Sequence, residues 1–113
     1  DRKSLEEADA AIKGLTERAK QRKLTREDLT GGTFTITNLG MYGVDFFTPI
    51  INPPEAAILG VGKVTEKPVI ASGKIETRPF MILSLSYDHR VVDGAPAAEF
   101  LGKVKEYIEN LVI

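Results

Sequence analysis

The sequence predicts an α+β fold of the α/β sandwich type, in which helices flank a mixed or antiparallel sheet. Three observations lead to this fold class. Amphipathic helical patterns lie at both ends of the chain, several strand patterns lie between them, and a long apolar loop follows the first strand. A run of strands with helices segregated to its ends is typical of a layer of helices on a sheet.

The two helices are predicted from apolar stripes. The first covers residues 5 to about 22 and begins with a capping box, in which Ser4 is followed three residues later by Glu7. Its stripe has to be buried against something, and it consists of Leu5, Ala8, Ile12, Leu15 and Ala19. Residues 25–28 could cap one short further turn. The second helix opens near Gly94 and Pro96, and its stripe consists of Ala97, Leu101, Val104, Ile108 and Leu111.

The strands are predicted between a glycine pair and the second helix. Gly31 and Gly32 break the chain, and residues 33–37 then alternate as a half-buried strand with Phe34 and Ile36 on one face. Further strands are predicted at residues 56–64, 68–71, 75–78 and 80–87, with a turn at 72–74. The loop at residues 41–54 is unusually apolar, and such loops are usually buried against a partner or line a site.

Composition excludes several classes of function. A chain of 113 residues is one domain or part of one. The net charge of −1 gives no electrostatic attraction to nucleic acid or to a membrane, so neither is an expected partner. The absence of cysteine excludes disulfides, thiolate metal sites and a cysteine nucleophile. No signal peptide is expected, and the expected location is the cytoplasm, or the mitochondrial matrix in a eukaryote.

The candidate site is the segment YDHRVVDG at residues 87–94. His89 is the only histidine in the chain, and it is the side chain whose ordinary pKa suits acid–base chemistry near neutral pH. It follows a strand pattern and precedes a helix, a place where scaffolds often present reactive groups. The segment also fits a structural role. A lone histidine at a strand end is more often structural, Asp93 could cap the helix, and Arg90 could pair with an acidic neighbour.

Three motifs in order resemble the dihydrolipoamide acyltransferases, the core subunits of 2-oxo acid dehydrogenase complexes. Residues 87–94 resemble the family signature DHRxxDG, residues 34–40 (FTITNLG) resemble the motif FTISNLG, and residues 48–60 are similar to the segment that follows it. The resemblance implies that residues 1–113 are the C-terminal part of the catalytic domain, with the chloramphenicol acetyltransferase-like fold of coenzyme A-dependent acyltransferases. It also implies trimers that build cubic or dodecahedral cores and bind the other subunits of the complex.

The same resemblance implies roles for three residues, in a channel between subunits. His89 is expected to be the general base, Thr37 to stabilise the oxyanion through its hydroxyl, and Asp93 to orient rather than to transfer protons. The substrates are coenzyme A and a dihydrolipoyl group carried on a separate lipoyl domain. A free thiol has a pKa of about 8.5 and is mostly protonated at neutral pH, so acyl transfer between two thiols needs a base. Both sulfurs belong to the substrates, so the chain itself needs no cysteine.

Two other functions stay open at this stage. The chain could be a non-catalytic fragment that acts only as an assembly scaffold. It could also be another coenzyme A acyltransferase of the same fold, although those usually carry a second histidine where Asp88 stands. The acyl group could be acetyl, branched-chain or succinyl, and an acetyl group, as in the pyruvate dehydrogenase complex, or a branched-chain group is preferred. No residue is assigned to coenzyme A binding.

Overall fold

The computed structural model describes residues 2–111. The chain forms two compact units, Asp1–Gly32 and Thr33–Ile113, and each is described by itself. The boundary follows the predicted break at Gly31 and Gly32. Gly31 has a φ of 82°, a backbone conformation that favours glycine.

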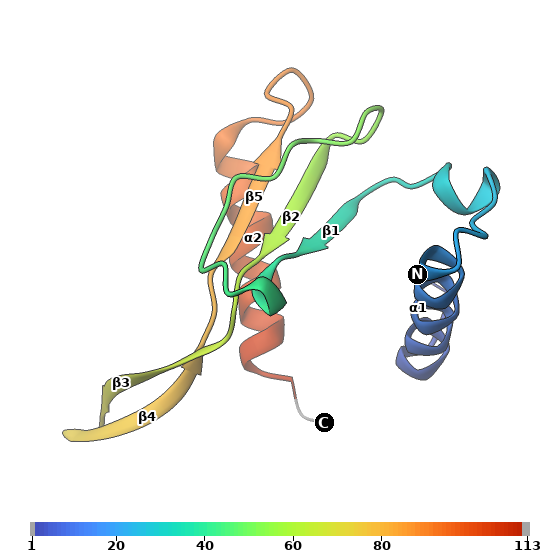
Figure 1. Cartoon of the computed structure of the whole chain (residues 1–113). Helices are drawn as coiled ribbons and strands as arrows, with labels where there is room; N and C mark the ends of the chain where they lie inside the picture. Colours follow the sequence, from blue (N-terminus) through green and yellow to red (C-terminus); the bar gives the residue numbers. More distant parts are fainter. Residues whose placement is uncertain (1, 112–113) are drawn as a thin grey trace. The chain divides into compact units, whose positions relative to one another are not determined.

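The first unit consists of helix α1, Leu5–Lys20, and the short 3₁₀ turn η1, Glu27–Leu29 (Figure 1). The predicted capping box is confirmed: the Glu7 N–H donates to Ser4 Oγ at 3.2 Å, and the Ser4 N–H donates to Glu7 Oε2 at 2.8 Å. The helix ends two residues earlier than predicted, because Arg22 adopts a φ of 57°.

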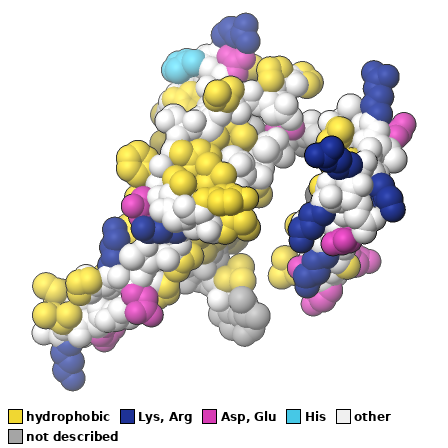
Figure 2. Space-filling view, viewed as in Figure 1, with side chains coloured by type: hydrophobic (Ala, Val, Ile, Leu, Met, Phe, Trp, Pro, Cys, Tyr) yellow, Lys and Arg dark blue, Asp and Glu magenta, His cyan; other side chains and the backbone are white. Residues whose placement is uncertain are grey.

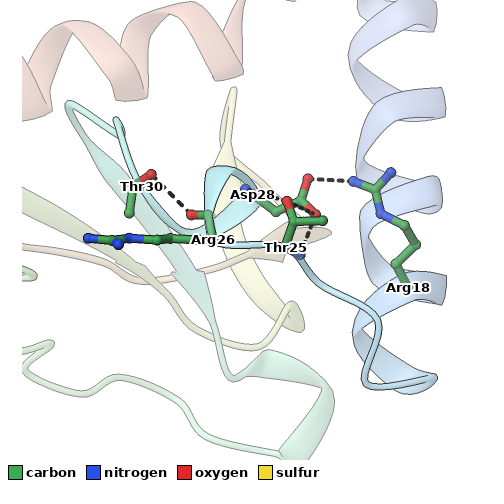
Figure 3. Close-up of polar contacts among 5 residues, drawn as sticks. All are labelled: Arg18, Thr25, Arg26, Asp28 and Thr30. Atoms are coloured by element: carbon green, nitrogen blue, oxygen red, sulfur yellow. Dashed lines mark hydrogen bonds and ion pairs between the residues drawn. The ribbon is translucent and has the colours of Figure 1, made fainter.

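The predicted short turn after α1 is also confirmed, and Asp28 holds it (Figure 3). Its Oδ2 accepts hydrogen bonds from the Thr25 N–H at 2.9 Å and the Thr25 hydroxyl at 3.1 Å, while its Oδ1 accepts from Arg18 Nη2 of α1. The Thr30 hydroxyl donates to the Arg26 carbonyl at 3.0 Å. The hydrogen bond from the Thr25 N–H lowers the pKa of Asp28, and Arg18 adds to this effect.

The predicted burial of the α1 stripe does not occur within the first unit. No residue of α1 is buried, and Leu5 and Ile12 are largely exposed. The helical period was correct, but a period shows only that a face requires a partner and not where that partner lies.

The second unit is built on a three-stranded sheet of order β1-β2-β5. Strand β1, Thr35–Asn38, runs parallel to β2, Ala57–Val61, and β2 runs antiparallel to β5, Leu83–Tyr87. Helix α2, Gly94–Glu109, covers one face, where the rings of Phe34 and Phe100 meet at 5.6 Å. The sheet is therefore mixed, and the predicted fold class is confirmed. The buried apolar side chains of the described residues are few: Pro49, Ile58, Leu59 and Ala97.

Strands β3, Thr65–Ala71, and β4, Lys74–Phe80, form a separate antiparallel hairpin that projects beyond the sheet (Figure 1). The predicted strand 80–87 is therefore wrong at its start, because Phe80 belongs to β4 and β5 begins at Leu83. The chain changes its pairing partner at residues 81–82, from β3 to β2. An alternating pattern continues through such a change, so the sequence could not reveal it.

The apolar loop between β1 and β2 packs over the face of the sheet opposite α2. It starts with a 3₁₀ turn, η2, Gly40–Tyr42, which the sequence did not predict. A Cβ on Gly60 would lie 3.1 Å from the Phe47 ring and 3.3 Å from Pro49, so the loop lies directly on β2. The Lys63 N–H donates to the Val44 carbonyl at 2.8 Å. Other apolar loop residues remain exposed, including Ile50, which is 90% exposed.

Candidate functional site

The segment 88–93 forms the connection between β5 and α2, and the backbone of Asp88 fixes its start. The Asp88 N–H donates to the Ala56 carbonyl at 2.8 Å, which extends the β2–β5 ladder by one step. The Asp88 carbonyl then accepts from the N–H groups of Val91 at 2.9 Å and Val92 at 3.1 Å. This turn presents His89 at the molecular surface, where it is the cyan side chain in Figure 2.

His89 and Asp93 lie together within this connection. Nδ1 of His89 is 3.6 Å from Oδ1 of Asp93, and the two side chains are 70% and 83% exposed. This distance is too long for a hydrogen bond, but it allows an ion pair when the ring is protonated. A carboxylate on the Nδ1 side favours the tautomer with its proton on Nδ1, which leaves Nε2 as the free base.

Asp93 also occupies the N-cap position of α2, the structural role considered from the sequence. Its backbone is extended, with φ −83° and ψ 165°, but its side chain accepts no hydrogen bond from the helix. Its carboxylate is therefore not engaged by the first turn of α2 and remains available to His89.

Arg90 pairs with an acidic neighbour, Asp88, as the structural alternative anticipated. Nη2 of Arg90 donates to Oδ2 of Asp88 at 2.7 Å, and Nε donates to Oδ1 at 3.0 Å. The hydrogen bonds from the Arg90 guanidinium, followed by that from the Arg90 N–H, lower the pKa of Asp88 to about 2. The sequence interpretation gave Asp88 no role. An aspartate at the start of a turn often accepts the backbone N–H two residues later, and this Asx-turn pattern could have revealed it.

Thr37 lies in β1, directly opposite Gly60 of β2. Paired residues project to the same face, so Thr37 lies on the face that carries the apolar loop and is half-buried there. The prediction that Ile36 faces a covered side is wrong within this chain, since Ile36 is 67% exposed. As the outer strand of this sheet, β1 has a neighbouring strand only on the β2 side.

The strand register keeps Thr37 and His89 apart within one chain. Thr37 is level with Gly60, whereas the Asp88 N–H bonds to Ala56, four residues away along β2 and on its opposite edge. Four residues of strand and two strand spacings place Thr37 and Asp88 ~16 Å apart. Side chains of a sheet stand perpendicular to it, so they do not close this gap. One chain therefore brings together His89 and Asp93, but not Thr37.

Other kinds of site were also sought among residues 2–111. That part of the chain contains no group of three potential metal-binding side chains. Within the same range, no helix has the length and apolar character needed to cross a membrane. A groove of about 520 Å³ lies between α2 and the β4–β5 connection. It is apolar, and its lining includes none of the predicted site residues.

Comparison with known proteins identifies a family. Residues 1–112 match the model of the 2-oxoacid dehydrogenases acyltransferase (catalytic domain) family. The dihydrolipoyllysine-residue succinyltransferase component of the 2-oxoglutarate dehydrogenase complex of Rickettsia felis is 50% identical over 97% of the chain, and the mitochondrial Bos taurus protein of that name is 48% identical over 90%. The chain spans 27% and 22% of these relatives, or about a quarter of their length.

Solved structures give the same result. The dihydrolipoamide acetyltransferase of Azotobacter vinelandii, studied for the catalytic role of a serine, a histidine and an asparagine, is 45% identical with a TM-score of 0.90. The cubic core of a pyruvate dehydrogenase multienzyme complex is 44% identical, also with a TM-score of 0.90. Each comparison covers 97% of this chain and 45% of the solved chain. The chain belongs to the 2-oxoacid dehydrogenase acyltransferase family and has the fold of its catalytic domain.

Proposed function

We propose that this chain is the C-terminal part of an acyltransferase catalytic domain that moves an acyl group between a dihydrolipoyl group and coenzyme A. The observation that carries the proposal is the exposed imidazole of His89, with a carboxylate 3.6 Å from its Nδ1. The three ordered motifs and the family membership support the same reaction. The lipoyl group would be carried on a separate domain.

The residue spacing supports the three roles. In the Azotobacter vinelandii enzyme, the serine precedes the histidine by 52 residues and the asparagine follows it by four. Thr37, His89 and Asp93 have the same two separations. Threonine replaces serine without loss of the hydroxyl donor, whereas Asp93 brings a negative charge where that enzyme has a neutral amide.

The chemistry follows from these groups. Nε2 of His89 takes the proton of the attacking coenzyme A thiol as sulfur bonds to the thioester carbonyl carbon. The carbonyl oxygen becomes an oxyanion, and the Thr37 hydroxyl donates a hydrogen bond to it. The intermediate then collapses, the bond to the dihydrolipoyl sulfur breaks, and the imidazolium returns its proton to that sulfur. Asp93 stabilises the imidazolium between the two proton transfers.

The separation of Thr37 and His89 implies that two subunits form each site. A hydroxyl and a base that serve one carbonyl carbon must lie within a few ångströms of the same atoms, and ~16 Å prevents this within a chain. The exposed apolar side chains on and after β1 would be buried by the neighbouring subunit: Ile36, Met41, Tyr42, Phe46 and Ile50. Trimers that build a larger core, with the other subunits of the complex attached, fit this requirement.

The relatives favour a succinyl group over the acetyl or branched-chain group preferred from the sequence. The curated relatives at 48–50% identity are named succinyltransferases, whereas the solved acetyltransferase is 45% identical. We therefore propose the succinyl reaction of a 2-oxoglutarate dehydrogenase complex, in the cytoplasm or the mitochondrial matrix. The signature motif is not specific for the acyl group, and this explains why the earlier preference is not supported.

The test is acyl transfer to free dihydrolipoamide by the full-length protein that contains this chain. Wild type should use succinyl-CoA in preference to acetyl-CoA. In His89→Ala, kcat should fall by a factor of ~10²–10⁴. Glu99→Ala, a change at an exposed position of α2, serves as a control and should retain activity. A His89→Ala protein with wild-type turnover would reject the mechanism. An assembled but inactive wild type would favour the scaffold alternative.

A further inference from the structure

We propose that Asp88 is a positioning residue for His89, because it holds residues 88–92 in the conformation that presents the imidazole. The inference rests on the proposed function and deepens it. It concerns a residue that contacts no reacting atom and acts only through the backbone on either side of the base.

The side chain of Asp88 binds the residue that follows His89. Its Oδ1 accepts the Arg90 N–H at 2.9 Å, which closes an Asx-turn around His89. The Arg90 guanidinium approaches the same carboxylate, with Nε at 3.0 Å from Oδ1 and Nη2 at 2.7 Å from Oδ2. The carboxylate therefore holds both the main chain and the side chain of Arg90.

The main chain of Asp88 anchors the same turn to the sheet. Its N–H bonds to the Ala56 carbonyl, and its carbonyl accepts from Val91 and Val92. His89 thus lies inside a closed set of hydrogen bonds that all start from one residue. A backbone held in this way fixes the direction in which the Cα–Cβ bond of His89 points.

The imidazole itself does little to fix its own position. Among the hydrogen bonds of residues 2–111, none involves the His89 side chain, and its aromatic neighbour Tyr87 lies 5.8 Å away between ring centroids. Its placement therefore depends on the backbone and on the Asp93 carboxylate, 3.6 Å from its Nδ1. Asp88 is also only 23% exposed, whereas the side chain of Arg90 is 90% exposed, so the carboxylate is the fixed member of the pair.

The inference is tested by two substitutions at one position, in the full-length protein. Asp88→Ala removes every side-chain contact, and we expect kcat to fall by ~10- to 100-fold with KM for succinyl-CoA unchanged, because a misplaced base costs turnover rather than binding. Asp88→Asn keeps the Oδ1 acceptor for the Arg90 N–H, and it should restore kcat to within ~3-fold of wild type, since one neutral hydrogen bond replaces a charged one.

Two further variants isolate the backbone contact. Arg90→Ala removes the guanidinium but keeps the N–H that bonds to Asp88, so its kcat should fall less than that of Asp88→Ala. Glu76→Ala removes a similar carboxylate in the β3–β4 hairpin. Glu76 also pairs with an arginine two residues later, since its Oε2 accepts from Nη2 of Arg78 at 3.0 Å. This matched control should leave kcat and KM at wild-type values.

The outcomes separate this inference from the proposed function. An inactive wild type, or an active His89→Ala protein, would reject the function. With the function intact, the inference is overturned if Asp88→Ala keeps wild-type kcat, if only KM changes, or if Asp88→Asn is as impaired as Asp88→Ala. Amide hydrogen exchange gives a readout that needs no activity. Residues 90–92 should exchange faster in Asp88→Ala than in wild type, and unchanged exchange would also overturn it.

Discussion

A mixed assembly of two inactive variants tests whether one site is shared between subunits. Thr37→Ala should lower kcat by ~10²–10³ through loss of an oxyanion donor, and His89→Ala by ~10²–10⁴ through loss of the base. Neither variant can form a complete site alone. In a mixed trimer, however, the intact His89 of a Thr37→Ala subunit can face the intact Thr37 of a His89→Ala subunit.

The expected recovery follows from ring geometry. Each of the three sites of a cyclic trimer takes its hydroxyl from one subunit and its base from the next. In a ring with two subunits of one variant and one of the other, one site receives both intact residues, whichever variant is in excess. Mixed trimers should therefore regain about one third of wild-type kcat per trimer, far above the ~1% or less expected of either variant alone.

The assay uses co-expressed full-length variants with two different affinity tags. Purification on both tags in succession isolates assemblies that contain both variants, and succinyl transfer to dihydrolipoamide is then measured. Two differently tagged copies of His89→Ala, purified in the same way, provide the control and should remain inactive. Mixed assemblies with no more activity than this control would refute the shared site, and with it the separation derived from the strand register.

Two further predictions concern stability. Gly62→Ala should destabilise the protein by ~1–3 kcal/mol or more, because the new Cβ would overlap the Asp45 carbonyl. Gly14→Ala should stabilise α1 by up to ~1 kcal/mol, because no atom lies within 4 Å of the new Cβ. Urea unfolding midpoints that shift equally in both variants would contradict this. The pKa of Asp88 is about 2 in the folded chain, below its ordinary value of 3.8, so its contribution to stability is complete above about pH 4 and is lost as pH falls toward 2. The melting temperature of Asp88→Asn should therefore lie below that of wild type at pH 6, and the difference should shrink below about pH 4; a difference independent of pH would exclude the charged contact.

The sequence predicted local structure well wherever that structure depends only on contacts between residues close together in the chain. The capping box of Ser4 and Glu7 and the turn at Asp28 need only contacts within a few residues, and both were confirmed. The start of β5 was missed because pairing passes from β3 to β2 at residues 81–82, and the alternating pattern is the same on either side.

The candidate site shows the same division. The i,i+4 spacing of His89 and Asp93 brings their side chains to 3.6 Å, and the spacing was visible in the sequence. The positions of Thr37 and His89 depend instead on which strands pair and in which register. Strand pairing is non-local, so the residue pattern gave neither the register nor the distance between the two residues. Only the family resemblance implied a channel between subunits. The anchoring role of Asp88 was missed because it depends on backbone groups, which every sequence contains; only the pairing of Arg90 with an acidic neighbour was anticipated.

A site divided between subunits would link activity to assembly. Isolated chains would keep His89 and Asp93 together but would lack a hydroxyl for the oxyanion, so dissociation would cost kcat even if every chain stayed folded. The distribution of apolar residues is consistent with this dependence. Few apolar side chains of the described residues are buried, while Phe46 and Ile50, in the loop that packs on the face of Thr37, remain exposed. Burial of that surface by a second copy would stabilise the assembly and bring a second subunit to the face that carries Thr37.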